Sequence, residues 1–211
     1  KLNGKPLIHY SIEVARSIFK DEQICVSTDR EEIKEISEQT GLKIPFIRPD
    51  YLASDTAGTR EVLLHALEYY QNLGKKIDTL VLLQPTSPLR NKKHILEALS
   101  LYNSSLDMVV SVKETVSNPY YVLFEENSNG FLEKSKKGNF TRRQDCPKVW
   151  EFNGSIYIIN SEKLKEKHMA KFEKVIPFEM SSHFSQDIDT INDFEYTEYL
   201  IKKKVYIKNQ L

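Results

Sequence analysis

Apolar residues in the first half of the chain alternate between helical spacing and short unbroken runs. Residues 7–19 carry apolar side chains three and four positions apart, behind a Pro6 that suits a first helical turn. The run Thr79-Leu80-Val81-Leu82-Leu83 is typical of a strand buried inside a parallel sheet. The same patterns predict further helices over residues 30–40, 59–73 and 92–101, and further strands over residues 24–26, 44–47 and 108–112. Strands and helices that alternate in this way predict βαβ units in a doubly wound α/β sheet.

The pattern changes after Lys113. Strands at residues 120–125 and 131–134 are predicted around the hairpin signal Asn129-Gly130, and a polar stretch follows to residue 148. The remaining chain predicts a strand at 155–159, a helix at 162–167, a strand at 175–178 and a helix from Ile191 to about Lys204, capped by Thr190 and Asp193. We therefore expect an α/β core of residues 1–113 and 175–211, interrupted by a β-rich insertion of residues 114–174.

Charge and composition narrow the class of protein. The 211 residues include 30 Lys and Arg and 30 Asp and Glu, so the formal net charge is zero. A dedicated nucleic-acid-binding protein normally has a basic excess, so we expect no nucleic acid as a partner. We also expect no membrane span, because no apolar run approaches the ~18–20 residues that a span needs. Two cysteines, Cys25 and Cys146, cannot form a disulfide framework, which favours the reducing cytoplasm.

A stiff polar loop follows the most apolar predicted strand. Residues 84–90 are Gln-Pro-Thr-Ser-Pro-Leu-Arg, and open parallel sheets bind ligands just beyond the carboxyl ends of their strands. The Gln84 amide offers both a donor and an acceptor, as reading a pyrimidine edge requires, and Arg90 is suited to a phosphate. The alternative interpretation is an ordinary turn into the next helix.

Two aspartates form a second candidate site. In an extended segment Asp187 and Asp189 project from one face, and two carboxylates together with substrate phosphates commonly hold Mg²⁺. The alternative is a pair of solvated acids ahead of a helix. The stretch from Arg48 to a helix start at Thr59 is either an anion site or plain helix capping. The basic stretch Thr141-Arg142-Arg143-Gln144 is by default a solvated loop.

Taken together, these segments resemble the acylneuraminate (CMP-sialic acid synthetase) family of cytidylyltransferases over nearly the whole chain. Residues 84–90 and 187–189 are the most specific parts of the resemblance. The other segments that carry it are Asn3-Gly4-Lys5-Pro6-Leu7-Ile8, Val26-Ser27-Thr28-Asp29, Arg48-Pro49 with Leu52-Ala53-Ser54-Asp55-Thr56, Arg143-Gln144 and Asn153-Gly154-Ser155-Ile156-Tyr157.

The resemblance implies a three-layer, Rossmann-like nucleotidyltransferase fold with a β-rich insertion that mediates homodimerisation. It implies a reaction in which the anomeric hydroxyl of a nine-carbon 2-keto sugar acid attacks the α-phosphate of CTP, giving a CMP-sugar and pyrophosphate. By the family pattern Asp187 and Asp189 hold Mg²⁺ (or Mn²⁺), and Arg48 acts beside them in catalysis. By the same pattern Arg48, Thr59 and Gln84 line the nucleotide and sugar pocket, and Arg143, Asn153 and Tyr157 face the sugar acid. We further assign Arg90 to the nucleotide and Tyr121 to the sugar acid. Arg143 is expected to serve the neighbouring subunit.

The chain departs from the family pattern in two places. The family's basic, glycine-rich phosphate loop ends shortly before the position of Lys1, so we expect about 20 further residues ahead of Lys1, forming a first strand and that loop. Second, Asn118-Pro119-Tyr120-Tyr121 stands where sialic acid enzymes often place a Lys, which leaves sialic, legionaminic and pseudaminic acids open as substrates. The competing hypotheses are a cytidylyltransferase for 3-deoxy-manno-octulosonate and a non-catalytic sugar-nucleotide-binding homologue.

Overall fold

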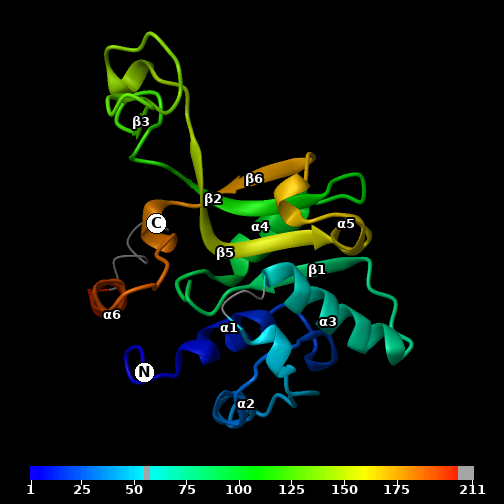
Figure 1. Ribbon diagram of the computed structural model, residues 1–211. Helices are drawn as coiled ribbons and strands as arrows, with labels where there is room; N and C mark the ends of the chain where they lie inside the picture. The colour runs from blue at the N-terminus through cyan, green and yellow to red at the C-terminus, as the bar shows by residue number, and fades with distance from the viewer. Residues whose placement is uncertain (55–57, 204–211) are drawn as a thin grey trace.

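A four-stranded sheet forms the centre of the computed structural model, which describes residues 1–54 and 58–203. The strands lie in the order β1-β5-β2-β6, with bounds β1 (Thr79–Leu83), β2 (Met108–Glu114), β5 (Trp150–Asn160) and β6 (Val175–Glu179). β5 runs antiparallel to both β1 and β2, whereas β6 runs parallel to β2. The sheet is therefore mixed, and its longest strand, β5, lies between the two all-apolar strands that the sequence predicted (Figure 1).

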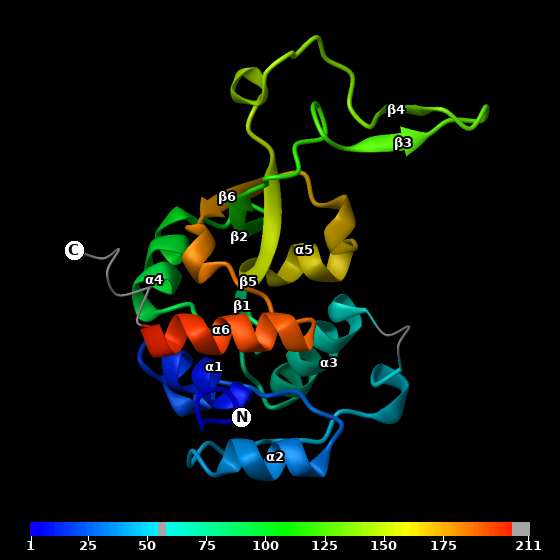
Figure 2. The ribbon, with the colours of Figure 1, turned by 90° about the vertical axis from the view of Figure 1, so that its left-hand side faces the viewer.

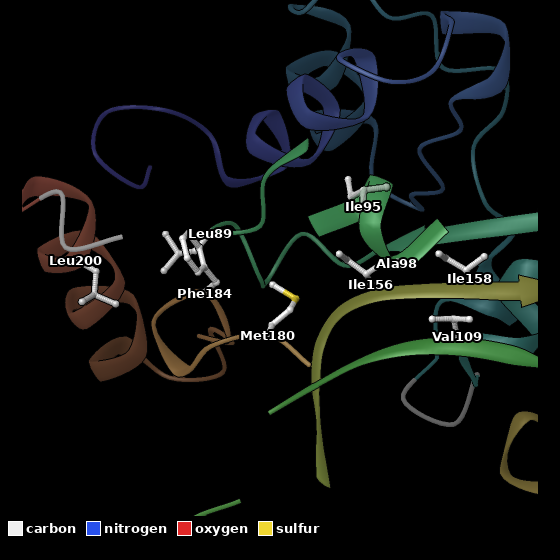
Figure 3. Close-up of a cluster of buried hydrophobic side chains, with 9 residues drawn as sticks. All are labelled: Leu89, Ile95, Ala98, Val109, Ile156, Ile158, Met180, Phe184 and Leu200. Carbon is white, nitrogen blue, oxygen red and sulfur yellow. The ribbon is translucent and has the colours of Figure 1, made fainter. Parts of the chain in front are cut away.

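Helices cover both faces of this sheet, as the three-layer prediction requires. On one face, α1 (Leu7–Arg16), α4 (Lys92–Leu101) and α6 (Ile191–Lys203) contribute to the apolar cluster that contains Val109, Ile156 and Ile158. Figure 3 shows Ile95 and Ala98 of α4 near these strand residues and Leu200 of α6 at the other end of the cluster. On the other face, α3 (Thr59–Asn72) and α5 (Ser161–Glu166) pack against Val110 and Ile159. Neighbouring residues of β2 and β5 thus supply opposite faces, as the pleat of a strand dictates. None of the described helices is long and apolar enough to cross a lipid bilayer.

The ends of several helices follow from local sequence signals. Thr190 and Asp193 form the predicted capping box of α6: the Thr190 N–H donates to Asp193 Oδ2 at 2.8 Å, and the Asp193 N–H donates to Thr190 Oγ1 at 3.3 Å. Gly74 follows α3 with a φ of +75°, a conformation that favours glycine. The helix α2 (Glu31–Glu38) lies beside α1, where His9 Nε2 is 2.7 Å from the Ile36 carbonyl oxygen.

The predicted strands at residues 24–26 and 44–47 are absent from the sheet, and this prediction is wrong. Both segments are extended, and the Arg48 N–H donates to the Thr28 carbonyl at 2.7 Å, but neither pairs as a strand. Between residues 24–27 and β1 lies a cavity of about 860 Å³, lined by apolar side chains of α1, α3 and β1. A strand needs a hydrogen-bonded neighbour, and this cavity stands where that neighbour would be.

The insertion projects from the sheet as a separate lobe (Figure 2). It contains a two-stranded hairpin of β3 (Phe124–Glu126) and β4 (Leu132–Lys134), which turns at Gly130 as predicted. The projecting segment begins after β2 and ends where β5 begins, so it is shorter than the expected 114–174. The sequence pattern assigned residues 150–160 to the insertion because the antiparallel return into the sheet leaves no periodic signal of its own.

Candidate active site

Three segments that are distant in sequence meet at the carboxyl end of β1. The turn of residues 84–90 follows Leu83, whose partner across the sheet is Ile156, so residues 153–155 of β5 lie next to that turn. The loop that contains Asp187 joins them, because the Ile188 N–H donates to the Thr86 carbonyl at 2.9 Å. The two most specific candidate segments of the sequence, residues 84–90 and 187–189, are thus brought together.

Asp187 lies at the centre of this junction. Ser87 is fully buried, and its hydroxyl lies 3.2 Å from Asp187 Oδ1 and 3.3 Å from the Asn153 carbonyl oxygen. On the other side Gly154, with a φ of +70°, has no side chain, and an added Cβ there would lie only 2.5 Å from Asp187 Oδ2. The Asp187 carboxylate is therefore held between a hydroxyl and a glycine backbone.

The carboxylates of this loop suit a divalent cation that takes its remaining ligands from water and from substrate phosphates. Asp189 is exposed two residues beyond Asp187, and no group of three metal-ligating side chains occurs in residues 1–54 and 58–203. Mg²⁺ typically takes one or two carboxylates, several waters and substrate phosphates rather than a closed protein cage. Asp187 and Asp189 supply such an incomplete set.

Arg90 is placed differently from the sequence prediction. Its side chain is only 4 % exposed, and Nη1 donates to the Gln84 and Ser87 carbonyls at 2.7 and 2.6 Å, while Nη2 donates to the Ser11 hydroxyl. Burial lowers the pKa of Arg90 to about 9, with the Asp187 charge acting in the opposite direction, so the guanidinium stays charged at neutral pH. Because its donors are directed at the protein backbone, its placement does not support the assigned contact with a phosphate.

Asn153 is also buried inside the protein, at 2 % exposure. Its Oδ1 accepts from the Ser111 hydroxyl at 2.6 Å and from the Ser155 N–H at 3.2 Å, and its Nδ2 donates to the Ser185 hydroxyl at 2.9 Å. The amide therefore joins β2, β5 and the loop after β6. Tyr157 lies four residues further along β5, where burial, with a smaller contribution from Asp187, raises the pKa of its phenol.

Arg48 and Thr59 line the cavity beside β1, together with Gln84. Arg48 pairs with Asp29, while its buried Nε has no hydrogen-bond partner among the described residues. The pKa of Asp29 is lowered, first by a hydrogen bond from its own backbone and then by Arg48. Residues 55–57, which belong to the Arg48–Thr59 stretch of the resemblance, lie outside the described residues.

Arg143 and Tyr121 lie in the projecting insertion and are exposed. Figure 2 shows this lobe well above the level of β1, so a single chain does not bring these two residues to Gln84 and Asp187.

Sequence reasoning missed four residues that organise the junction. Ser111, Ser185 and Gly154 surround Asn153 and Asp187, and Ser87 had been quoted only as part of its loop. One signal was available: Ser111 interrupts the otherwise apolar buried run of residues 108–112, and a buried hydroxyl normally has a hydrogen-bond partner.

Comparisons with known proteins show which fold the chain has. A solved structure of CMP:2-keto-3-deoxy-manno-octonic acid synthetase complexed with CTP superposes with a TM-score of 0.70 at 16 % identity, covering 97 % of this chain and 90 % of that one. At that identity the likeness shows the fold alone, which is the predicted nucleotidyltransferase fold.

Two curated relatives are more similar in sequence. Post-translational flagellin modification protein B of Campylobacter coli is 35 % identical over 209 residues, covering 97 % of this chain and 87 % of the relative. N-acylneuraminate cytidylyltransferase of Streptococcus agalactiae serotype V is 33 % identical over 214 residues, covering 96 % of this chain but only 50 % of that longer protein. The model of a family described as "Cytidylyltransferase" matches residues 1–211. The chain therefore belongs to the cytidylyltransferase family.

Proposed function

We propose that this cytidylyltransferase joins CTP to a nine-carbon 2-keto sugar acid, releasing pyrophosphate and forming a CMP-sugar. The observation that carries the proposal is the meeting of the Gln84 turn with Asp187 at the carboxyl end of β1. The similarity to N-acylneuraminate cytidylyltransferase over 96 % of the chain supports the nine-carbon class of acceptor.

The chain's own residues suit the individual tasks of this reaction. Gln84 and Thr59 line the cavity beside β1, and the Gln84 amide can pair with a cytosine edge. Arg48 lines the same cavity, and a guanidinium there is suited to a phosphate oxygen. Nucleotidyl transfer depends mainly on in-line positioning and charge neutralisation, and the bond to pyrophosphate breaks as the sugar hydroxyl attacks the α-phosphorus.

Asp187 and Asp189 are the residues that would hold a divalent cation in this site. When bound there, Mg²⁺ or Mn²⁺ neutralises phosphate charge and makes the attacking hydroxyl easier to deprotonate. Ser87 and Gly154 fix the Asp187 carboxylate, so the protein contributes orientation as well as charge.

The protein acts as a homodimer formed by the insertion. Its large apolar side chains are exposed in the single chain, including Phe131 at 69 % and Leu132 at 71 %, and exposed apolar side chains gathered in one segment are typical of an interface. A partner subunit would cover this surface and bring Arg143 toward the other subunit's site. The cytoplasm, where CTP is available, is the expected compartment, and both Cys25 and Cys146 are free thiols.

Pyrophosphate release tests the proposal directly. The full-length protein is incubated with CTP, Mg²⁺ and one of four acids: N-acetylneuraminate, a legionaminate, a pseudaminate or 3-deoxy-manno-octulosonate. We expect release with at least one nine-carbon acid and none when UTP or ATP replaces CTP. Release with 3-deoxy-manno-octulosonate alone would show that this eight-carbon acid, and not a nine-carbon acid, is the substrate. Binding of CTP without release from any acid would identify a non-catalytic homologue.

A further inference from the structure

We infer that Arg90 is a positioning residue that sets the nucleotide-facing turn and, through Ser87, the carboxylate of Asp187. This inference rests on the proposed function of residues 84–90 and Asp187 in binding CTP and its cation. It assigns to Arg90 a role that differs from direct contact with a phosphate.

Arg90 holds the turn that follows β1. The Ser87 N–H donates to the Gln84 carbonyl at 3.3 Å, which closes a four-residue turn. Arg90 Nη1 donates to the carbonyls at both ends of that turn, at 2.7 Å to Gln84 and 2.6 Å to Ser87. The guanidinium thus fixes the direction in which the Gln84 side chain leaves the end of β1.

Ser87 connects this turn to Asp187. The residue whose carbonyl accepts from Arg90 is also the residue whose hydroxyl lies 3.2 Å from Asp187 Oδ1. Ser87 has no freedom to move within its surroundings, because it is fully buried and packed against Asn153. A displacement of the Ser87 backbone would therefore shift the hydroxyl that orients the carboxylate.

Arg90 is itself bound to a helix of the core. Its Nη2 donates to Ser11 of α1, a residue 79 positions earlier in the chain, so the turn is tied to a helix of the core rather than to another loop. The side chain is 4 % exposed; both terminal nitrogens have acceptors, whereas the buried Nε has no hydrogen-bond partner among the described residues. The hydrogen bonds of the terminal nitrogens offset part of the cost of burying the cation. The combination indicates that Arg90 holds the two halves of the site, Gln84 and Asp187, in one arrangement.

Binding of Mn²⁺ and CTP, measured without any sugar acid, separates this role from the identity of the acceptor. Free Mn²⁺ is followed by electron paramagnetic resonance while CTP is titrated into the full-length wild type, Arg90→Met, Arg90→Lys and Ser87→Ala. We expect Arg90→Met to weaken both CTP and Mn²⁺ binding by about tenfold or more, and Ser87→Ala to weaken Mn²⁺ binding by about tenfold with little change for CTP. Arg90→Lys should recover part of the CTP affinity, since it keeps the charge and one donor direction.

Arg60 provides the matched control. Its guanidinium also donates to two backbone carbonyls, those of Leu164 and Lys165, at 2.9 Å each. Arg60→Met should lower the melting temperature without changing either affinity. If Arg90→Met does not fold, Ser11→Ala, which removes only the Nη2 partner, should still weaken both affinities several-fold.

Three results would overturn the inference. The first is unchanged Mn²⁺ and CTP affinity in folded Arg90→Met or, where that variant does not fold, in Ser11→Ala. The second is a loss in Arg60→Met equal to that in Arg90→Met, which would mean that both arginines act through stability alone. The third is a wild type that binds neither Mn²⁺ nor CTP, which would also remove the proposed function. A wild type that binds both but uses no sugar acid would remove only the proposed acceptor.

Discussion

Gly154 illustrates at the scale of one residue how the site depends on the absence of a side chain. An added Cβ would lie 2.5 Å from Asp187 Oδ2 and 3.3 Å from Ser87 Oγ, and the φ of +70° already disfavours any other residue. We predict that Gly154→Ala displaces the Asp187 carboxylate and lowers kcat by about tenfold or more. Steady-state kinetics and thermal melting measure both effects.

Gly130→Ala is the control for backbone strain. Gly130 has a similar φ of +80°, and nothing lies within 4 Å of the Cβ position in the described structure. This variant should lose stability in the hairpin and keep its kcat. An equal fall in kcat for the two variants would refute the role given to the Gly154–Asp187 contact.

Asp187 and Asp189 carry a second prediction at this scale. Asp→Asn at either position keeps the shape and removes the charge, so kcat should fall by orders of magnitude while the fold persists. Asp21→Asn serves as the control: its carboxylate pairs with Arg16 at the surface, and we expect kcat to be retained. Turnover close to wild type in Asp187→Asn or Asp189→Asn would contradict the metal assignment.

Single residues of the site were predictable from sequence to different degrees. Gln84 and Asp187 could be found, because strand order brings the ends of neighbouring strands to one edge of a sheet. The role of Arg90 could not, since its acceptors are backbone carbonyls and a Ser11 hydroxyl 79 residues away. Asn153 was assigned to the substrate, yet its buried amide is used by Ser111, Ser155 and Ser185. The residue type indicates which hydrogen bonds a side chain can form, and only the packing shows which partner it forms them with.

At the scale of elements, Asp107 joins β2 to the start of β6. Its buried Oδ2 accepts from the Glu173 and Lys174 N–H groups at 2.9 and 3.3 Å, and it pairs with Lys167 at 3.1 Å. Burial raises the pKa of this carboxyl, but the hydrogen bonds and Lys167 outweigh burial, so the pKa lies below its usual value. We predict that Asp107→Asn lowers the free energy of unfolding by about 1–3 kcal/mol at neutral pH.

The difference in the free energy of unfolding between wild type and Asp107→Asn should shrink as the pH falls. A carboxyl with a lowered folded-state pKa stabilises the protein above its unfolded pKa, and this stabilisation is lost as pH falls through the folded pKa. Urea unfolding should therefore show a large difference between wild type and Asp107→Asn at about pH 7 and a smaller one at about pH 3. The exposed Asp78→Asn, whose only ion pair is with Lys76 in the part of the chain described, should change little at either pH. A difference that grows on acidification would contradict the sign.

Elements with strong local signals were predicted with the correct bounds, and those that depend on a distant partner were not. The bounds of β1 and α4 agree with the predicted ranges 79–83 and 92–101, because apolar runs and turn residues mark their ends. Residues 24–26 have an equally apolar sequence but lack a paired neighbour. The antiparallel β5 was predicted as a short strand outside the sheet. The hydrophobic pattern of a strand does not reveal its direction or its pairing partner.

At the scale of the whole molecule, the exposed apolar face of the insertion predicts a dimer. Wild-type protein at micromolar concentration should have twice the monomer mass in solution. Phe124→Glu, which places a charge on the exposed hairpin, should give a monomer with reduced activity. Leu73→Glu, at an exposed apolar residue just beyond α3, should leave the mass unchanged. A monomeric wild type, or full activity in Phe124→Glu, would contradict the proposed assembly.

The cavity beside β1 has a consequence for how the chain behaves at high concentration. Among the described residues β1 pairs only with β5, so its other edge offers backbone N–H and C=O groups to an apolar space of about 860 Å³. Such an edge accepts any extended apolar segment, including one from another copy, and unprotected edges are a common origin of aggregation. Light scattering should then show that the 211-residue chain forms larger particles over time at high concentration.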